Sequence, residues 1–166
     1  MGHGLILGQT ESGKTTLAKR MAQDLKSKQV GILVLDPIKD PAWNADFITD
    51  DPHEFLNVFW ESRSCVVFID EAGENVGNFD EEMKKTATRG RHWGHSCFYI
   101  AQRGTLIART VRDQCSVMYL FNSGREDCKV HAQEWNCDEL MSANLLQKGE
   151  FYHVTRFSGA KKCRLF

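Results

Sequence analysis

A glycine-rich loop near the start of the chain, residues 8–15, reads Gly-Gln-Thr-Glu-Ser-Gly-Lys-Thr. It follows apolar residues 5–7 and precedes a stretch in which leucine or methionine recurs every four positions, as on one face of a helix. A strand, a loop with this glycine and lysine spacing, and a helix form the pattern of a phosphate-binding loop. The glycines let backbone N–H groups approach phosphate oxygens, and the helix contributes its positive N-terminal end. We therefore expect this loop to bind a nucleoside triphosphate.

The lysine and threonine that close the loop have specific expected roles. Lys14 should reach the β- and γ-phosphates and take part in catalysis, and the Thr15 hydroxyl should bind Mg²⁺. The expected nucleotide-binding residues are Gly8, Gln9, Thr10, Glu11, Ser12, Gly13, Lys14, Thr15 and Thr16. The alternative is a glycine loop that only turns the chain, and the flanking strand and helix patterns argue against it.

Short apolar runs alternate with helical patterns along the chain. These runs lack the polar alternation of half-exposed strands, as strands covered on both faces should. They are residues 4–7, 30–35, 65–69, 97–101 and 116–121. This order predicts an α/β fold with a mostly parallel sheet. No repeat, linker or low-complexity stretch interrupts the 166 residues, so we expect a single domain, residues 1–166.

Capping residues predict a helix in the middle of the chain. Asn78 is the expected N-cap, Glu81 follows three residues later, and Gly90 is the expected stop. Before this helix, residues 40–64 are expected to form a loop and one short helix.

The last third of the chain is predicted to form two helices and an extended pair. The helices are expected at residues 126–135 and 138–146, and the extended runs at 150–155 and 163–166, joined around Ser158-Gly159. Residues 148–166 carry five basic residues and one acidic residue. This segment is interpreted as a solvated basic tail, with a nucleic-acid or partner contact as the alternative.

Bulk composition excludes some classes of protein. The net charge is −1, so no global basic surface indicates nucleic-acid binding, and no apolar run approaches the ~20 residues of a membrane span. Six cysteines without a C-x-x-C pair favour a reducing compartment. The groups Cys128–His131–Cys137 and His92–His95 match no common zinc spacing, and ordinary burial is the preferred interpretation.

Two carboxylates follow the apolar run at residues 65–69. Asp70 is expected to hold Mg²⁺ and Glu71 to polarise the attacking water, since adjacent side chains diverge at a strand end. Gln102 follows the next apolar run. If that strand lies between the loop strand and the Asp70 strand, its amide faces the γ-phosphate and can contact both phosphate and water.

These motifs, with the stretches at residues 89–103 and 110–115, resemble a known family. The sequence is similar to FtsK/HerA-type DNA-pumping P-loop ATPases. It most resembles the genome-packaging ATPases of tailless, membrane-containing icosahedral (tectivirus-like) phages. The resemblance implies an additional-strand, RecA-like three-layer sandwich that uses ATP and Mg²⁺.

The resemblance also implies a homo-oligomeric ring, usually a hexamer, with an arginine supplied to the neighbouring nucleotide. Arg89 matches that position, with Arg91 as a substitute and Arg112 as a further candidate that otherwise pairs with Asp113. Three other arginines, Arg103, Arg109 and Arg125, are not ranked. Such an arginine neutralises charge in the phosphoryl transition state and contributes roughly 10³–10⁵ in rate.

The implied function is ATP-driven translocation of double-stranded DNA, packaging a viral genome into a preformed capsid. Implied partners are duplex DNA, contacted through phosphates without sequence specificity, and a capsid or portal-vertex protein. The implied location is the host cytoplasm or the packaging vertex, as a soluble protein. Two alternatives stay open: a small nucleotide or metabolite kinase, with Asp36 holding the acceptor hydroxyl, and a nucleotide-dependent binding switch.

Overall fold

The computed structural model describes residues 2–75 and 80–166. Its strands are β1 (His3–Leu7), β2 (Gly31–Leu35), β3 (Phe47–Thr49), β4 (Cys65–Ile69), β5 (Ser96–Ala101), β6 (Cys115–Leu120), β7 (Glu150–Thr155) and β8 (Ser158–Arg164). They form one sheet in the order β3-β2-β4-β5-β1-β6-β7-β8. Strands β1 to β6 are parallel, and β7 and β8 continue the sheet in antiparallel pairing. The predicted α/β fold with a mostly parallel sheet is confirmed, and β5 does lie between β1 and β4.

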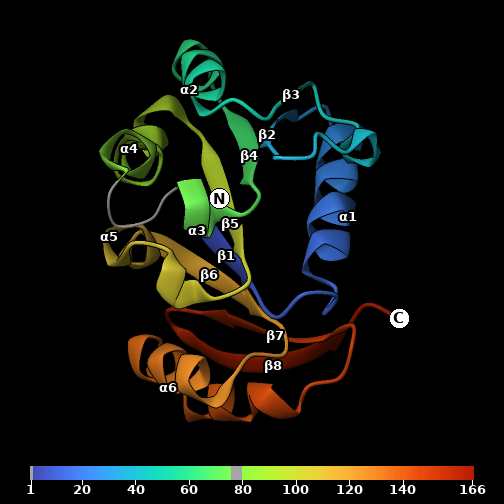
Figure 1. Ribbon diagram of the computed structural model, residues 1–166, viewed down its shortest axis with the longest axis vertical. Coiled ribbons are helices and arrows are strands. Elements are labelled where there is room, and N and C mark those ends of the chain that lie inside the picture. Colours follow the sequence, from blue (N-terminus) through green and yellow to red (C-terminus); the bar gives the residue numbers. More distant parts are fainter. Residues whose placement is uncertain (1, 76–79) are drawn as a thin grey trace.

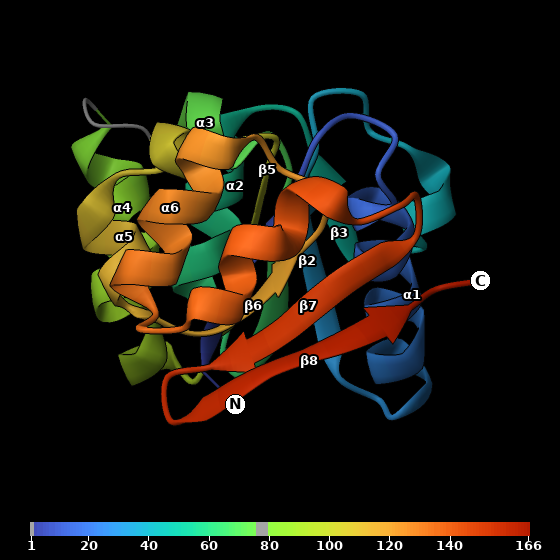
Figure 2. The ribbon, with the colours of Figure 1, turned by 90° about the horizontal axis from the view of Figure 1, so that it is seen from below.

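Helices cover both faces of this sheet. The α-helices are α1 (Lys14–Ser27), α2 (Pro52–Glu61), α3 (Ala72–Asn75), α4 (Glu81–Arg89), α5 (Arg109–Asp113) and α6 (Arg125–Glu134). Short 3₁₀ turns are η1 (Pro41–Trp43), η2 (Gly90–Trp93), η3 (Gly104–Leu106) and η4 (Asp138–Leu145). In Figures 1 and 2, α1 lies on one side of the parallel strands, and α2, α4, α5 and α6 lie on the other. The three-layer arrangement follows from this distribution.

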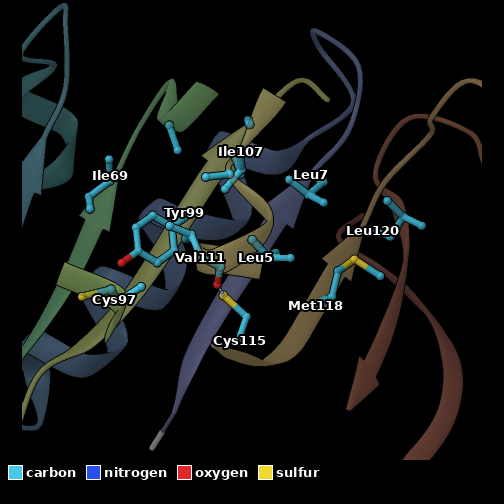
Figure 3. Packing of buried hydrophobic residues seen from close by; sticks show 14 of the residues in the cluster. Leu5, Leu7, Ile69, Cys97, Tyr99, Ile107, Val111, Cys115, Met118 and Leu120 are labelled. Carbon is cyan, nitrogen blue, oxygen red and sulfur yellow. Dashed lines mark hydrogen bonds between the residues drawn. The ribbon is translucent and has the colours of Figure 1, made fainter. Parts of the chain in front are cut away.

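Two buried apolar clusters hold the layers together. Leu5 and Leu7 of β1 pack in the cluster that includes α2, α4 and α6, whereas Ile6 packs in the cluster with Ala18 and Ala22 of α1. Successive side chains of a strand point to opposite faces, so a strand between two helical layers must be apolar throughout. Figure 3 shows the first cluster, with side chains from neighbouring parallel strands lying side by side.

Several boundaries differ from the sequence-based predictions. Helix α4 begins at Glu81 and is capped by Asp80, whose side chain accepts a hydrogen bond from the backbone N–H of Met83. The predicted cap, Asn78, lies outside the described residues. The strand β3 and the helix α5 were not predicted, because three and five residues are too few to show a periodic pattern.

The predicted helix at residues 138–146 is the 3₁₀ segment η4. Only Leu140 and Ala143 are buried within it, and this three-residue spacing suits 3₁₀ geometry, in which side chains three apart lie on one side.

The turn of the C-terminal pair also differs from prediction. Thr155 pairs with Ser158, so β7 and β8 are joined through Arg156 and Phe157, and Ser158-Gly159 begins β8. The Arg156 side chain donates hydrogen bonds to three backbone carbonyls, those of Cys115, Glu134 and Arg112. The turn is therefore fixed by the hydrogen bonds of Arg156 to these distant carbonyls. It does not depend on Gly159, which lies within β8. Residues 148–166 are therefore largely part of the sheet and do not form a free tail.

Candidate nucleotide-binding site

The carboxyl ends of the central strands gather the predicted site residues at one end of the sheet. Leu7 is level with Ala101 across the β1–β5 pairing, and Ile69 is level with Tyr99 across the β4–β5 pairing. The segments that follow these strands therefore emerge side by side. They carry the glycine loop, the Asp70–Glu71 pair and Gln102.

Both glycines of the loop occupy positions that exclude other residues. Gly8 has a φ of 154°, and a Cβ there would lie 2.5 Å from Cβ of Phe121. Gly13 has a φ of 114°, and a Cβ there would lie 3.1 Å from the Phe121 ring and 3.1 Å from Cδ1 of Leu165. Glycine alone accepts this backbone without strain. The loop is thus shaped by a tight fit against β6 and the C-terminal segment.

Backbone hydrogen bonds fix the loop at both ends. The N–H of Gly8 donates to the carbonyl of Ala101 at 3.2 Å, and the N–H of Gln9 donates to the carbonyl of Asn122 at 2.8 Å. Near the other end, the Ser12 carbonyl accepts the N–H of Gly149 at 2.9 Å. The Ser12 hydroxyl is buried and lacks a hydrogen-bond partner among the described residues. A loop held this way binds a ligand without first being ordered.

Helix α1 begins directly at Lys14 and presents an open N-terminus. Its N-cap is Gly13, which supplies no side-chain hydrogen bond to the first turn. The N–H groups of that turn therefore stay available to an anion, in addition to the positive end of the helix dipole. Thr15 and Thr16 lie in this turn, and both remain at least partly exposed. The arrangement fits phosphate oxygens.

The Lys14 ammonium lies among the other charged groups of the site. Its Nζ donates to the carbonyl of Gln9 at 3.3 Å. Burial lowers the pKa of Lys14, and the nearby carboxylates of Asp70 and Glu71 raise it. The ammonium therefore stands between the loop and the two carboxylates, where a polyphosphate chain would meet it.

Asp70 is held in a partly buried position at the end of β4. Burial raises its pKa, and the nearby Asp36 and Glu71 raise it further, against a hydrogen bond from the Glu71 N–H at 2.9 Å that lowers it. Glu71 is exposed and has a φ of 52°, which is unusual for a residue with a side chain. Strain of this kind is concentrated at functional sites.

The donors at this position suit Mg²⁺. Carboxylate and hydroxyl oxygens are its preferred ligands, and it typically takes only one or two from the protein and the rest from water and phosphate. Asp70 and Thr15 supply such oxygens. A divalent cation would also relieve the repulsion among the carboxylates that raises the pKa of Asp70.

The two other candidate metal groups take structural roles. Within residues 2–75 and 80–166, no three histidine, cysteine or acidic side chains cluster as metal ligands. His95 contacts the Phe59 carbonyl at 2.8 Å and accepts the Cys65 N–H at 3.1 Å. Cys128 and His131 are buried residues of α6 itself.

Gln102 lies beside the loop at the end of β5. It is exposed and lines a cavity of about 330 Å³ together with Gln9, Arg103 and the first residues of α6. Arg103 does not point freely into this cavity, because Asp127 holds its guanidinium through contacts of 3.0 and 3.1 Å. Gln102 and Gln9 are therefore the neutral amide side chains that line this cavity.

The candidate arginines differ sharply in their surroundings. Arg112 is buried and donates to both oxygens of Glu134 and to the carbonyls of Gly104 and Ile107, so it is a structural residue of this subunit. The predicted Arg112–Asp113 pair is wrong, since Asp113 lies 3.9 Å from Arg109. The long Arg112 side chain instead reaches from α5 to Glu134 on α6.

Arg89 and Arg91 are both exposed. Arg91 donates to Oε1 of Gln114 at 2.8 Å, whereas the Arg89 side chain forms no hydrogen bond or ion pair with any other described residue. Arg89 ends α4, next to Gly90, whose added Cβ would lie 3.8 Å from the ring of His3 at the start of β1. It therefore lies toward the amino ends of the strands, away from its own phosphate loop.

Asp36, the acceptor-binding residue of the kinase alternative, is already engaged. Its carboxylate accepts hydrogen bonds from the N–H groups of Ile38 and Asp40 and from Nε1 of Trp43. These bonds shape the turn after β2, and Asp36 is only 2% exposed, so its carboxylate is not accessible to a substrate hydroxyl. The structure thus gives the kinase alternative no support.

Comparison with known proteins agrees with this geometry. Residues 2–80 match the family model described as "Helicase HerA, central domain". The chain resembles FtsK/HerA-type ATPases. No curated protein sequence matches the chain.

Solved structures show the same fold over the whole chain. The genome packaging NTPase B204 from Sulfolobus turreted icosahedral virus 2, in complex with AMPPCP, has a TM-score of 0.84 at 16% identity, covering 99% of this chain and 97% of its own. The pCW3 conjugation coupling protein TcpA has a TM-score of 0.75 at 15% identity, covering 99% of this chain and 60% of its own. The N-terminal domain of zonular occludens toxin from Neisseria meningitidis has a TM-score of 0.62 at 16% identity, covering 100% and 94%. The P-loop NTPase fold is thereby shown.

The residues that support the phosphate loop from outside were not predicted from the sequence. Asn122 donates through Nδ2 to the carbonyls of Asn144 and Leu146, and its own carbonyl accepts the Gln9 N–H. Gly149 contacts Ser12 from the far end of the chain. Asn122 directly follows the apolar run at residues 116–121. This position at the end of a predicted strand is the sequence signal that could have identified it. Gly149 offered no such signal.

Proposed function

We propose that this protein is an ATP-hydrolysing motor that translocates double-stranded DNA and packages a viral genome into a preformed capsid. The observation that carries the proposal is the convergence of the phosphate loop, the Asp70–Glu71 pair and Gln102 at one end of the sheet, with β5 between β1 and β4. Similarity to the HerA central domain and to a genome packaging NTPase supports double-stranded DNA as the polymer that is moved.

The proposed hydrolysis uses side chains of the phosphate loop and of the ends of β4 and β5. The loop N–H groups and Lys14 hold the β- and γ-phosphates of ATP, and Asp70 with the Thr15 hydroxyl holds Mg²⁺. The cation neutralises charge on the phosphate oxygens when it is bound. Glu71 accepts a proton from the attacking water as its oxygen bonds to the γ-phosphorus and the bond to ADP breaks. Gln102 hydrogen-bonds the γ-phosphate and responds to its release.

A ring of identical subunits, most simply a hexamer, completes the proposed site. Arg89 is exposed and lies at the end of the sheet opposite its own phosphate loop, so it serves a nucleotide only in a neighbouring subunit. Arg91 is the substitute. Arg112 is excluded because its guanidinium is buried against Glu134. Duplex DNA would pass through the ring by phosphate contacts, and the ring would dock on a capsid or portal-vertex protein.

None of the described helices is long and apolar enough to cross a bilayer. The proposed place of action is the host cytoplasm or the packaging vertex of the virion, as a soluble protein.

The rate of ATP hydrolysis with and without duplex DNA tests this function. We expect duplex DNA of any sequence to stimulate hydrolysis, and the stimulation to fall with salt because phosphate contacts release counterions. Slow hydrolysis at a rate that DNA does not change would indicate a nucleotide-dependent binding switch. Transfer of phosphate to a small acceptor would indicate a kinase.

A further inference from the structure

A second cavity adjoins the phosphate loop on the side away from Gln102. It has a volume of about 210 Å³ and is bounded by the loop and the first turn of α1 on one side and by Lys148 and Phe166 on the other. The cavity near Gln102, at about 330 Å³, lies beside Gln9 instead. The loop is thus flanked by two separate hollows.

The C-terminal segment is fixed against the loop and forms the outer wall of this second cavity. The Gly149 N–H donates to the Ser12 carbonyl at 2.9 Å, and the Leu165 N–H donates to the Gly149 carbonyl at 2.8 Å. Arg20 of α1 donates to the Leu165 carbonyl at 3.0 Å. Figures 1 and 2 both place the C-terminal end of the chain beside α1. Residue 166 is therefore held at a defined place.

The Phe166 ring packs on glycine and leaves most of its surface open. Gly149 has a φ of 85°, and a Cβ there would lie 2.5 Å from the Phe166 ring, so only glycine permits this approach. Phe166 nevertheless remains 63% exposed. An aromatic ring held in place with a free surface is suited to stacking on a flat ligand.

The direction of a bound nucleotide identifies that ligand. The γ-phosphate must point toward Glu71 and Gln102, so the sugar and base must leave the loop past Thr15 and Thr16. That path leads into the cavity bounded by Phe166. A phosphate group does not stack on an aromatic ring, whereas a nucleobase does.

We propose that Phe166 is the stacking platform for the nucleobase of the bound triphosphate. The proposal rests on the proposed function for the presence of a triphosphate on the loop. Every base presents a flat π surface, so stacking on Phe166 increases affinity without distinguishing adenine from guanine. Phe166 is thus a binding residue for the base and takes no part in bond cleavage.

Calorimetric titration with three ligands tests this role: ATP, GTP and tripolyphosphate, each with Mg²⁺. Phe166→Ala should weaken ATP and GTP binding by about 5- to 150-fold, the loss expected for one stacked base, while tripolyphosphate binds as in the wild type. The matched control is Phe157→Ala, since Phe157 is fully exposed at the turn between β7 and β8 and should leave all three affinities unchanged. Phe166→Trp should retain ATP affinity and show quenching of its fluorescence on binding.

Three outcomes would overturn the inference. They are an unchanged ATP affinity in Phe166→Ala, an equal loss for tripolyphosphate, or a wild type that binds tripolyphosphate as tightly as ATP. Failure of the proposed function has a different signature. In that case ATP still binds better than tripolyphosphate and depends on Phe166, but its hydrolysis does not respond to DNA.

Discussion

Arg112 and Glu134 form a two-pronged ion pair between α5 and α6, with Nε 3.0 Å from Oε1 and Nη2 2.9 Å from Oε2. Both side chains are nearly buried, at 10% and 12% exposure. The remaining nitrogen of the guanidinium donates to two backbone carbonyls, so all three nitrogens have hydrogen-bond acceptors within the protein.

Arg112→Ala should therefore destabilise the protein strongly. Glu134 would be left as a buried charge without its partner, which typically costs about 3–5 kcal/mol of the free energy of unfolding. Urea denaturation measures the loss. Arg109→Ala is the control, because its side chain is 73% exposed and lies 3.9 Å from Asp113, a pair that contributes less than ~1 kcal/mol. Equal midpoints for the two variants would show that the buried pair is not structural.

Gly13→Ala should impair the phosphate loop. The φ of 114° and the contacts at 3.1 Å place a side chain in a strained and crowded position, at a cost of about 1–3 kcal/mol. We expect lower stability and a loss of ATP binding, measured by thermal unfolding and calorimetry. Gly124→Ala offers a comparison, since a Cβ at Gly124 meets no atom within 4 Å and its φ is −64°. ATP binding by Gly13→Ala at wild-type affinity would contradict the tight fit.

Asp70→Asn should stabilise the nucleotide-free protein at neutral pH. Burial raises the pKa of Asp70, so the folded protein binds this proton more tightly than the unfolded chain. The folded state is thus penalised above that pKa, and the penalty disappears as the pH falls below the ordinary carboxyl value of about 4. Asparagine removes the charge but keeps an oxygen that accepts the Glu71 N–H. Denaturation at pH 7 and pH 4 should show a gain that shrinks with acid, and exposed Asp50→Asn should show none.

Glu71→Gln should separate binding from turnover. The amide cannot accept the proton of the attacking water, so we expect hydrolysis to fall by roughly 10²–10⁴-fold while ATP affinity is retained. Steady-state rates and equilibrium titration give the two quantities. Glu61→Gln, an exposed position at the end of α2 and at the opposite end of the sheet, should change neither. Wild-type turnover in Glu71→Gln would assign the water to another group.

Arg89→Ala should abolish hydrolysis without loss of ATP affinity, since the arginine is proposed to serve a neighbouring subunit. A contribution of roughly 10³–10⁵ in rate is expected for such a residue. Mixing Arg89→Ala with Lys14→Ala subunits should restore some activity, because an interface can then combine an intact loop with an intact arginine. The same mixture with Arg91→Ala distinguishes the substitute. No recovery at any ratio would make Arg89 a structural residue.

The parallel core and the glycine loop were predictable because their determinants are local. Each apolar run is bounded by its own turn residues, and the loop carries its own spacing at residues 8–15. The prediction that Gln102 faces the γ-phosphate depended on β5 lying between β1 and β4. The structure meets that condition, with Leu7 and Ile69 both paired to β5.

The long-range contacts that complete the site could not be predicted from the sequence, for a physical reason. Gly149 and Ser12 are separated by most of the chain, and no local pattern records which distant carbonyl an N–H will meet. The same holds for Arg112, where a sequence neighbour, Asp113, was preferred to Glu134 on the next helix. Side-chain pairs across helices depend on packing, which single-sequence patterns do not contain.

The two outermost strands limit how copies of this protein can join. Strand β3 has only three residues, and β8 carries exposed Lys161 and Lys162 along its length. Short or lysine-bearing outermost strands resist pairing with the backbone of another molecule. Sheet continuation from one copy to the next is therefore disfavoured. In the proposed ring, neighbouring subunits would then meet through helices and loops, and such contacts can rearrange without breaking backbone hydrogen bonds between strands.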